Sequence, residues 1–395
     1  MTKLLVVNHF PVLPARIGGQ QAVLGLAAGL AAYYQPTEIV WTQRKTAQRS
    51  EVQVAGTPLV ATAVPNRWLQ RQVGRWLRRG LGHVDTDIGS LLCSGGNRAL
   101  VSHLLDISAD GDLLLLAHPW LWPAVKRVLA RRRLRLVYDA HNVEYRLKQQ
   151  SLKPGRVSAW AVERVRRAEA ELVARADLTL ACTQRDAETL AALGGVPAAR
   201  LVVGSKGIAE STRADAVALA RTRRDTGRVA IFVGSNHPPN NEAARWIIET
   251  LAPACPGWQF LVAGACGPAA GVAPSTANVK VLGPVDDLLA LMARADVALN
   301  PMEAGSGINM KLFEYLQCAL PVLSTPFGAR GFEALEPSGI VRAERAGFAA
   351  ELDALVADPA RHAALGAAGT ACVRANFIWP VVARRVHEAI EALAR

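Results

Sequence analysis

A turn with two glycines leads directly into a helical pattern that carries one lysine and one glutamate. The segment reads PMEAGSGINMKLFEYLQCALPVLST, residues 301–325. Backbone amides of such a turn can approach a ligand closely because glycine has no Cβ, and the start of the next helix favours an anion. On one helix, Gly307, Lys311 and Glu314 would share a stripe. We therefore predict an anionic, hydroxyl-bearing ligand here, such as a nucleotide diphosphate.

Two further glycine turns follow predicted strands. Gly18 and Gly19 come after the first strand and precede a predicted helix, and Gly234 ends the strand in VAIFVGSNHPPNNEAARW. Each turn could present amides to a phosphate, and each could be a plain turn into a helix. Neither has the G-x-G-x-x-G spacing of a dinucleotide fingerprint.

Two histidines sit at the predicted carboxyl ends of neighbouring strands. His118 lies in LLLLAHPWLWP and His141 in VYDAHNVEY. A single histidine is usually structural, but two at strand ends in one domain favour a polar site. Glu144 is either a ligand contact or a favourable charge at a helix N-terminus.

A metal site is not predicted. Asp85 and Asp87 in HVDTD have the Asp-x-Asp spacing of some metal sites, but they lie between helical patterns, and we interpret them as a solvated turn. The six cysteines form no C-x-x-C pair, so we expect them to be small buried apolar residues.

A basic amphipathic segment stands out at residues 67–79. Apolar side chains and arginines lie on opposite sides of the predicted helix in NRWLQRQVGRWLRRG, which is typical of helices at a membrane interface. The alternative is an ordinary surface helix whose apolar side joins the core. The apolar residues are Trp68, Leu69, Val73, Trp76 and Leu77.

Alternating apolar runs and helical patterns predict an α/β fold built from two doubly wound sheets. A polar stretch at 208–228 separates the two series and is the predicted linker. Ligands of such sheets bind beyond the carboxyl ends of the strands, so we expect the site between the two domains. The predicted strands are KLLVVN, EIVWT, DLLLLA, LRLVYD, DLTLAC and RLVVG, and then VAIFVG, QFLVAG, VKVLG, VALNP and PVLST.

Length and charge limit the functional classes. The chain has 395 residues and a formal net charge of +12, which suits two domains and an anionic partner. No nucleic-acid-binding signature accompanies the charge, so nucleic acid is not the expected partner. Without a signal-peptide pattern or a long apolar run, a cytoplasmic location is expected.

Taken together, the motifs resemble the GT-B glycosyltransferases, specifically the large retaining family 4. The segments that carry the resemblance are Gly18-Gly19, YDAHNVEY, IFVGSNHPPNNEAARWI, GSGINMKLFEYLQCALPVLST and NFIWPVVARRV. The resemblance implies two Rossmann-like domains that face a central cleft. It implies an acceptor-binding domain over 1–207, the linker 208–228, a nucleotide-sugar-binding domain over 229–377, and a helix over 378–395 that crosses back to the first domain.

The resemblance also implies roles for single residues. Glu314 would bind the ribose hydroxyls, Lys311 and the amides around Gly307 would hold the diphosphate, Gly19 would approach the same phosphates, and His118 would lie near the reacting sugar. The implied catalytic candidates are His118, Lys311 and Glu303. The implied donor-binding residues are Gly18, Gly19, Gly234, Ser306, Gly307, Ile308, Lys311 and Glu314, and the acceptor-side candidates are His141, Asn142 and Glu144.

Two departures from the family pattern concern charge. Ser306 stands where many members have the first Glu of a Glu-x7-Glu pair, and Glu303 lies three residues earlier. No Arg or Lys follows Gly234 in SNHPPNNEA. Lys311 is therefore the expected substitute for the missing phosphate-binding cation.

The resulting hypothesis is a glycosyltransferase that needs neither cofactor nor metal and moves a sugar, with retention, from a UDP- or GDP-linked donor to a hydroxyl. The acceptor would be a glycan, a lipid-linked sugar or a small molecule in cell-surface glycan or glycolipid synthesis. Residues 67–79 would hold the enzyme peripherally at the anionic inner face of the plasma membrane. The alternative is a non-catalytic nucleotide-binding partner or scaffold with the same fold, and the missing fingerprint disfavours a Rossmann oxidoreductase.

Overall fold

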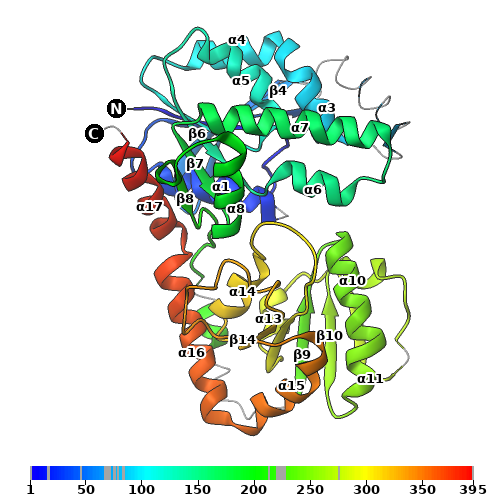
Figure 1. The fold of residues 1–395 in the computed structure, drawn as a ribbon. Helices are drawn as coiled ribbons and strands as arrows, with labels where there is room; N and C mark the ends of the chain where they lie inside the picture. The colour runs from blue at the N-terminus through cyan, green and yellow to red at the C-terminus, as the bar shows by residue number, and fades with distance from the viewer. Residues whose placement is uncertain are drawn as a thin grey trace. The chain divides into compact units, whose positions relative to one another are not determined.

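The chain divides into two compact units, shown as ribbons in Figure 1. Unit 1 comprises Met1–Ala209 and Trp379–Arg395, and unit 2 comprises Glu210–Ile378. This computed structural model describes residues 2–15, 18–44, 47–65, 73, 77, 80–81, 85–211, 214–218, 228–274 and 276–393, with the side chains of residues 43 and 44 excepted.

Unit 1 is built on an eight-stranded sheet in the order β3-β4-β2-β1-β5-β6-β7-β8. All its described strand pairs are parallel except the β3–β4 pair. The strands are β1 (Leu4–Asn8), β2 (Thr37–Arg44), β3 (Gln48–Val54), β4 (Thr57–Pro65), β5 (Leu113–Ala117), β6 (Arg135–Asp139), β7 (Leu178–Ala181) and β8 (Leu201–Val203).

The central strands of unit 1 are continuously apolar because helices cover both faces of the sheet. Every residue of LLVVN in β1 and LLLLA in β5 is buried. One face packs on α1 (Gly18–Leu30) and α17 (Trp379–Ala392). The other packs on α4 (Arg98–Ile107), α5 (Trp122–Leu129), α7 (Arg156–Arg175) and α8 (Gln184–Gly194).

Further helices of unit 1 are α3 (Thr86–Cys93), α6 (Glu144–Ser151) and the short 3-10 turns η1 (Ser94–Gly96), η2 (Pro119–Leu121) and η3 (Ala198–Arg200).

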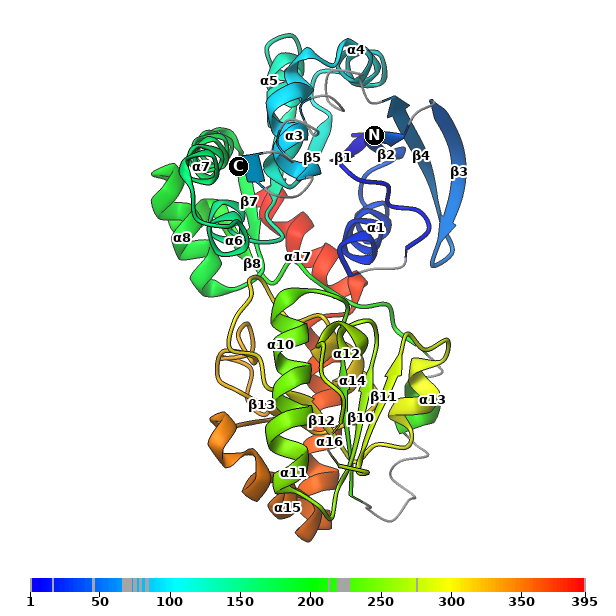
Figure 2. The same cartoon turned by 90° about the vertical axis from the view of Figure 1, so that its right-hand side faces the viewer.

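The hairpin of β3 and β4 is absent from the sequence-based strand assignment. It lies at the edge of the sheet, where Figure 2 shows it clearly. Its turn residues Ala55 and Gly56 both have positive φ, 49° and 80°, as a two-residue hairpin turn requires. The pattern VQVAGTPLV therefore carried a hairpin signal that the analysis of apolar runs missed.

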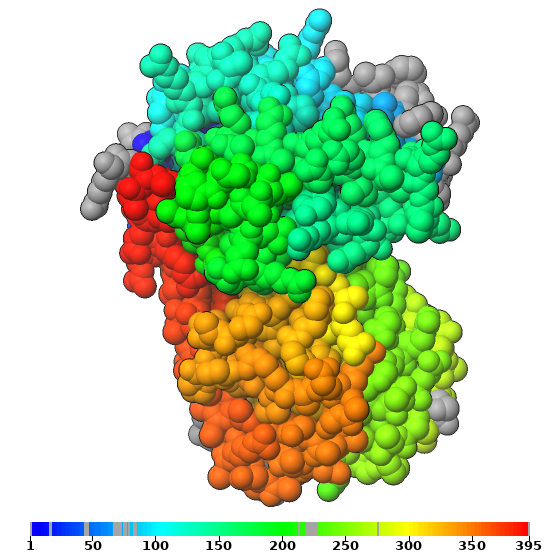
Figure 3. Space-filling model, viewed as in Figure 1, coloured from blue at the N-terminus to red at the C-terminus, as the bar shows by residue number. Residues whose placement is uncertain are grey.

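The last helix of the chain packs on the first helix of unit 1. A Cβ at Gly25 would lie 1.9 Å from Trp379, and a Cβ at Gly29 would lie 2.8 Å from Ala383. These two glycines are one helical turn apart on α1 and let α17 approach its backbone. Figure 3 shows the outer side of α17, in red, at the surface.

Unit 2 has a six-stranded sheet in the order β11-β10-β9-β12-β13-β14, with all described pairs parallel. The sequence analysis identified all its strands except the short edge strand β14. The strands are β9 (Val229–Val233), β10 (Gln259–Ala263), β11 (Val279–Gly283), β12 (Val297–Asn300), β13 (Val322–Ser324) and β14 (Ile340–Arg342).

The helices of unit 2 alternate with its strands, as a doubly wound fold requires. They are α10 (Pro238–Trp246), the π-helical turn η4 (Ile247–Leu251), α11 (Ala252–Ala254), α12 (Cys266–Ala269), α13 (Leu288–Met292), α14 (Lys311–Gln317), the 3-10 turn η5 (Arg345–Gly347), α15 (Phe348–Ala357) and α16 (Pro359–Asn376). The prediction of two doubly wound α/β domains is confirmed.

Candidate active site

Each sheet has a point where consecutive crossovers leave in opposite directions, and ligands of open α/β sheets bind there. In unit 1 this point lies between β1 and β5, and in unit 2 it lies between β9 and β12. His118 directly follows β5, and Gly234 directly follows β9. The strand-end positions predicted for these two residues are therefore confirmed.

In unit 2, an arginine holds the glycine turn after β12. Arg330 donates hydrogen bonds to the carbonyl oxygens of Ser306, at 2.8 Å, and of Gly307. Gly305 and Gly307 have φ values of 128° and 60°, which favour glycine. With two carbonyl groups occupied by Arg330, the turn is fixed in one conformation.

The helix after this turn starts later than the sequence pattern predicts. Helix α14 begins at Lys311, and Gly307 and Ile308 lie in the loop before it. The prediction that Gly307, Lys311 and Glu314 share one helical stripe is therefore wrong, because the positive φ of Gly307 ends any helical path there. Lys311 and Glu314 do lie on the first turn of α14.

Lys311 is a half-buried cation with a neutral hydrogen-bond partner. Its Nζ donates to Oδ1 of Asn240 at 2.9 Å and lies 4.3 Å from the centre of the Phe232 ring. No carboxylate among the described residues lies within ion-pair distance of this ammonium. Burial lowers the pKa of Lys311 to about 7. The site therefore favours an anion that would restore the charge of this lysine.

Asn240 links Lys311 to the turn after β9. Its Nδ2 donates to the carbonyl oxygen of Ser235 at 3.2 Å, and the hydroxyl of Tyr315 accepts from the amide of Val233 at 2.8 Å. A Cβ at Gly234 would lie 2.9 Å from Sγ of Cys266, so this turn needs glycine. The segment 235–243, which contains no Arg or Lys, therefore contributes the side-chain amide of Asn240, which positions Lys311.

Two glutamates of unit 2 differ in environment. Glu314 is half-buried, and burial raises its pKa. The side chain of Glu303 is 54% exposed and lies 3.6 Å from the guanidinium of Arg345. Arg345 is held in turn by both carboxylate oxygens of Glu242. Glu303 is thus a surface carboxylate next to a fixed arginine.

In unit 1, the strand ends after β5 and β6 carry paired histidines and carboxylates. Nδ1 of His118 bonds Oε1 of Glu144 at 2.8 Å, and Nε2 of His141 bonds Oδ2 of Asp139 at 2.9 Å. The rings of His118 and His141 are 4.2 Å apart. Lys206, a buried residue, donates to Oδ1 of Asp139 at 2.6 Å. The structure therefore brings these predicted residues together in one polar cluster.

The charges within this cluster largely neutralise one another. Burial alone would raise the pKa of Asp139, but the charge of Lys206 and the contact with His141 hold it well below its usual range. Burial, with the nearby charge of Lys206, lowers the pKa of His141 to about 3. His141 is therefore a neutral ring at physiological pH.

Glu144 has the helix N-terminal position that the sequence offered as one alternative, and its carboxylate contacts neighbouring protein groups. It is the first residue of α6, and its carboxylate also accepts from Asn142 at 3.2 Å in addition to His118. Its amide donates to Oε1 of Glu169 at 2.9 Å, and the hydroxyl of Tyr138 donates to the same oxygen at 2.9 Å. Burial, reinforced by the charge of Glu144, raises the pKa of Glu169 to about 8.

The interpretation of Asp85 and Asp87 as a solvated turn is wrong. Asp85 is buried and caps helix α3, and Nζ of Lys148 donates to both aspartates at 2.7 Å. Oδ1 of Asp87 also bonds Nε2 of His9 at 2.8 Å. Burial favours a raised pKa for Asp87, but His9 and Lys148 outweigh it and hold the pKa well below its usual range. The pair is therefore part of the polar interior.

Gly18 and Gly19 differ from their predicted positions. They are the first two residues of α1 rather than a turn before it. A Cβ at Gly19 would meet only the tip of Phe10, at 3.6 Å. Space alone therefore does not require glycine at position 19.

Several residues of these clusters were missed by the sequence analysis: His9, Lys148, Glu169, Lys206, Asn240 and Arg330. His9 carried a usable signal, since it directly follows the first strand as His118 follows β5. Lys148 and Glu169 lie within helices far along the chain from their partners. No local pattern marks such residues.

Most of the basic segment 67–79 lies outside the described residues. Of its five apolar residues, only Val73 and Leu77 are described; Leu77 is fully buried, and Val73 packs against the same core cluster. No helix in the described ranges is long and apolar enough to cross a bilayer. The six cysteines are all buried, as expected, and none of them forms a disulfide.

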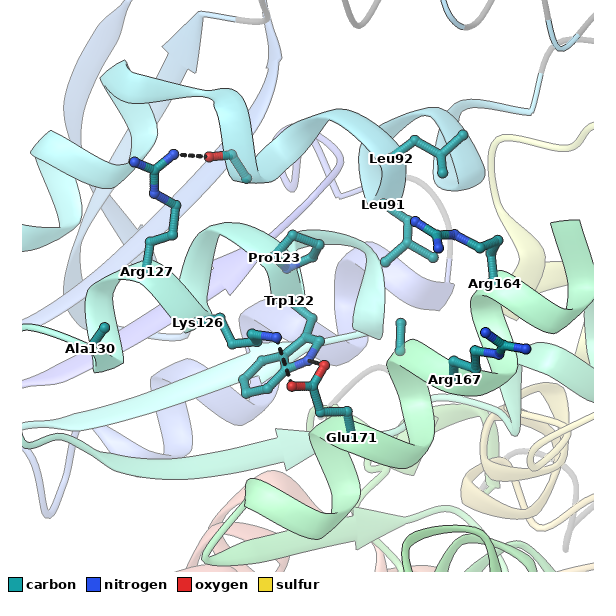
Figure 4. Close-up of a pocket in the computed structure, with 12 residues that line it drawn as sticks. Leu91, Leu92, Trp122, Pro123, Lys126, Arg127, Ala130, Arg164, Arg167 and Glu171 are labelled. Carbon is teal, nitrogen blue, oxygen red and sulfur yellow. Dashed lines mark hydrogen bonds and ion pairs between the residues drawn. The ribbon is translucent and has the colours of Figure 1, made fainter.

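Metal-ligand side chains do not gather in groups of three or more within the part of the chain that the structure describes. A cavity of about 550 Å³ lies elsewhere in unit 1, between α3, α5 and α7 (Figure 4). Its polar contacts include an ion pair of 2.7 Å between Lys126 and Glu171. None of the sequence-predicted site residues lines this cavity.

Two doubly wound units of this kind are the architecture of the GT-B class of glycosyltransferases. Residues 227–358 match the family model of glycosyl transferases group 1, and residues 18–207 match that of the glycosyl transferase 4-like domain. The chain belongs to this glycosyltransferase family. No curated protein matches its sequence.

Solved structures share the fold at low sequence identity. Anabaena Alr3699/HepE in complex with UDP and glucose is 15% identical, with a TM-score of 0.67 over 99% of this chain and 100% of that chain. Sucrose-phosphate synthase from Thermosynechococcus elongatus is 14% identical, with a TM-score of 0.73 over 100% and 99%. An E. coli trehalose-6-phosphate protein bound with UDP-2-fluoro glucose is 14% identical, with a TM-score of 0.69 over 99% of each chain.

Proposed function

We propose that this glycosyltransferase moves a sugar from a nucleoside diphosphate sugar to an acceptor hydroxyl, with retention of anomeric configuration. The observation that carries the proposal is Lys311, a half-buried cation without a carboxylate partner among the described residues, at the switch point of unit 2. A diphosphate is an anion that would restore its charge. A UDP-linked donor is favoured, since a similar fold is known in complex with UDP and with UDP-glucose.

The chemical role of unit 2 is to stabilise the leaving diphosphate. Negative charge grows on the phosphate oxygen as its bond to the anomeric carbon breaks. Lys311 and the amides near Gly234, Ser306, Gly307 and Ile308 would meet that charge without reorganising during the reaction. Glu314, on the first turn of α14, would hold the ribose hydroxyls. Glu303, close to Arg345, remains a candidate for a contact with the transferred sugar.

Unit 1 would bind the acceptor and would also contact the sugar that is transferred. His118 is proposed to contact the reacting sugar, and His141, Asn142 and Glu144 are proposed to position the acceptor. The departing phosphate would take the proton of the attacking hydroxyl on the same face of the sugar. Gly18 and Gly19, at the start of α1, would approach the phosphates.

A nucleotide screen tests this proposal directly. A ligand at about 100 times its dissociation constant stabilises a protein by roughly 2.7 kcal/mol, so UDP should raise the Tm more than GDP, ADP or CDP. UDP-sugars should then be turned over in excess EDTA, because Lys311 and backbone amides supply the positive charge. Activity that is lost in EDTA and restored by magnesium or manganese would contradict the proposal that the reaction needs no metal ion. Nucleotide binding without turnover of any sugar would favour a non-catalytic scaffold.

The acceptor is proposed to be a lipid-linked or membrane-proximal glycan in cell-surface glycan synthesis. Arginines of the 67–79 segment would each contribute about 1 kcal/mol at an anionic membrane surface. Co-sedimentation with anionic vesicles that weakens at high salt would support a peripheral, cytoplasmic enzyme. Equal failure to bind anionic and neutral vesicles at low salt would favour a soluble acceptor.

A further inference from the structure

Two buried imidazoles meet at the switch point of unit 1. His9 follows β1, and His118 follows the neighbouring strand β5. Their ring centres are 5.4 Å apart, with the rings nearly perpendicular. Only 4% of His9 and 7% of His118 is exposed. The two rings therefore form one compact pair at the edge of the sheet where ligands of this fold class bind.

Each ring uses one nitrogen for a carboxylate and leaves the other without a partner. Nε2 of His9 bonds Asp87 and Nδ1 of His118 bonds Glu144, both at 2.8 Å. Nδ1 of His9 and Nε2 of His118 are buried and have no hydrogen-bond partner among the described residues. Buried polar atoms in native proteins normally meet a partner, so each of these nitrogens calls for a ligand atom or a water molecule.

The carboxylates determine which hydrogen-bonding role remains. An ionised carboxylate only accepts, so each neutral ring places its N–H toward its carboxylate and a lone pair on the opposite nitrogen. Burial lowers the pKa of His9, which favours the neutral ring. With one proton on each ring, directed at the carboxylate, both unpartnered nitrogens are acceptors and require donors.

The backbone of His118 supports a ligand role. Its φ is 63°, a left-handed value that is uncommon for a residue with a side chain. Such strain is concentrated at functional sites, where it aims a side chain. Phe10 contacts both rings edge-on, with centres 4.9 Å from His9 and 5.7 Å from His118. An aromatic side chain beside polar acceptors suits a ligand with both apolar and hydroxyl surfaces.

We infer that His9 and His118 form a paired acceptor site that binds two hydroxyl groups of one sugar. The inference rests on the proposed glycosyl transfer and adds His9, which the family resemblance does not assign, as a substrate-binding residue. A phosphate does not suit this site, because a phosphate dianion has no proton to donate and Asp87 and Glu144 lie behind the rings. The sugar is that of the donor or that of the acceptor.

Isosteric variants separate the two sides of each ring. The side-chain amide of asparagine reaches the position of Nδ1, and that of glutamine reaches the position of Nε2. His9→Asn and His118→Gln thus retain a group on the ligand side. His9→Gln and His118→Asn retain only the bond to the carboxylate. A purely structural role predicts the opposite ranking.

The donor arm of the test compares UDP with UDP-glucose by calorimetry on the full chain. We expect His9→Gln and His118→Asn to lower the affinity for UDP-glucose by roughly threefold to tenfold, with UDP affinity unchanged. His9→Asn and His118→Gln should stay closer to wild type. His103→Asn, at a half-buried histidine that bonds Glu38 in the same unit, is the matched control.

The acceptor arm uses nitrogen NMR of the histidine-labelled full chain saturated with UDP and titrated with methyl α-glucoside. Nδ1 of His9 and Nε2 of His118 should be unprotonated in the free protein and should move upfield when the sugar binds. A response to UDP-glucose alone assigns the site to the donor sugar, and a response to the glucoside assigns it to the acceptor.

Two results would overturn the inference. One is a proton on either of these nitrogens in the free protein. The other is a UDP-binding protein in which neither sugar probe moves either nitrogen, which would leave buried water as their partner. Failure of the wild-type chain to bind any nucleotide would instead contradict the proposed function, and the protonation of the free rings would still be measured.

Discussion

The switch points of the two units differ in whether their charged side chains have ion-pair partners. In unit 1, buried carboxylates, histidines and lysines are paired with one another, as in the contacts of Asp139 with Lys206 and of Asp85 with Lys148. In unit 2, Lys311 contacts the neutral side chains of Asn240 and Met302, has no ion pair with a described carboxylate, and has a pKa that burial lowers to about 7. The charged groups of the first site are paired with one another, whereas the second site has no carboxylate within ion-pair distance of its lysine among the described residues.

The difference indicates what each site is prepared to bind. A cluster whose cations are already paired with carboxylates offers little to an anion, but its hydrogen-bond acceptors suit hydroxyl groups. Burying a cation without an ion-pair partner costs free energy, and binding of an anion offsets that cost. Under the proposed function, unit 1 would recognise hydroxyl groups and unit 2 would recognise the charged diphosphate. The four experiments below separate these two roles.

The largest expected effect comes from disrupting the internal pairing of unit 1. Glu169→Ala would leave the amides of Glu144 and Tyr145 and the hydroxyl of Tyr138 without their acceptor. At roughly 1 kcal/mol or more for each buried donor, the free energy of unfolding should fall by about 3 kcal/mol, as measured by urea denaturation. UDP affinity should persist below the transition.

Glu163→Ala is the matched control on the same helix. Among the described residues, Glu163 forms ion pairs with exposed Arg166 and Arg167 on α7, and exposed ion pairs contribute little. Its removal should leave the unfolding curve in place. Equal stability of the two variants would contradict the view that unit 1 depends on its buried pairs.

Lys311→Met, in unit 2, should lower UDP affinity without lowering stability. The loss of a charge-assisted contact to phosphate should reduce UDP affinity by about tenfold to a hundredfold, equivalent to about 1.5 to 3 kcal/mol. Stability should be maintained or increased, since burial disfavours the charged form of this lysine. Calorimetry and urea denaturation measure the two properties.

Lys280→Met, at an exposed lysine of β11, is the corresponding control and should bind UDP like the wild type. If Lys311→Met bound UDP with wild-type affinity in a folded protein, the anion site would have to lie elsewhere.

The pH dependence of binding sharpens the same contrast. A diphosphate prefers protonated Lys311, so binding should raise the pKa of this lysine above its value of about 7 in the free protein. UDP affinity should therefore fall as pH rises above about 7, by at most tenfold per pH unit. Calorimetry between pH 7 and 9 in buffers of different ionisation enthalpy would also detect the proton taken up.

Lys311→Met should abolish both the pH dependence and the proton uptake. A constant wild-type affinity across this range would show that Lys311 does not change its protonation on binding.

The smallest expected effect is that of Glu314→Ala. Its proposed ribose contacts are the same before and during the reaction, so UDP affinity should fall about fivefold, or roughly 1 kcal/mol, while kcat changes little. Exposed Glu249 offers a control substitution to alanine. A loss of kcat with full UDP affinity would assign Glu314 to the chemistry instead.

The sequence predicted those features that local periodicity encodes. The buried runs LLVVN and LLLLA are strands covered on both faces, and their pattern is unambiguous. The edge hairpin of β3 and β4 was missed because β3 alternates between exposed and half-buried residues. Its signal lay in the turn at Ala55 and Gly56 rather than in apolar content.

The sites were predictable only where their residues lie at strand ends. His118 and Gly234 were found in this way. Asp85 and Asp87 are instead paired with Lys148, which lies 63 and 61 positions away in the chain. Charged residues in a polar stretch are normally solvated, and only the folded chain shows that a lysine from a distant helix reaches them.

The contact between α1 and α17 has a consequence for the order of synthesis. Val382, Ala383, Val386 and Ile390 belong to the core of unit 1, although they are translated after all of unit 2. Unit 2 is one continuous segment, whereas the core of unit 1 is complete only after the final helix has been synthesised. Until then the groove beside Gly25 and Gly29 is open. A nascent or truncated chain would thus expose an apolar surface, a natural target for chaperones and proteases.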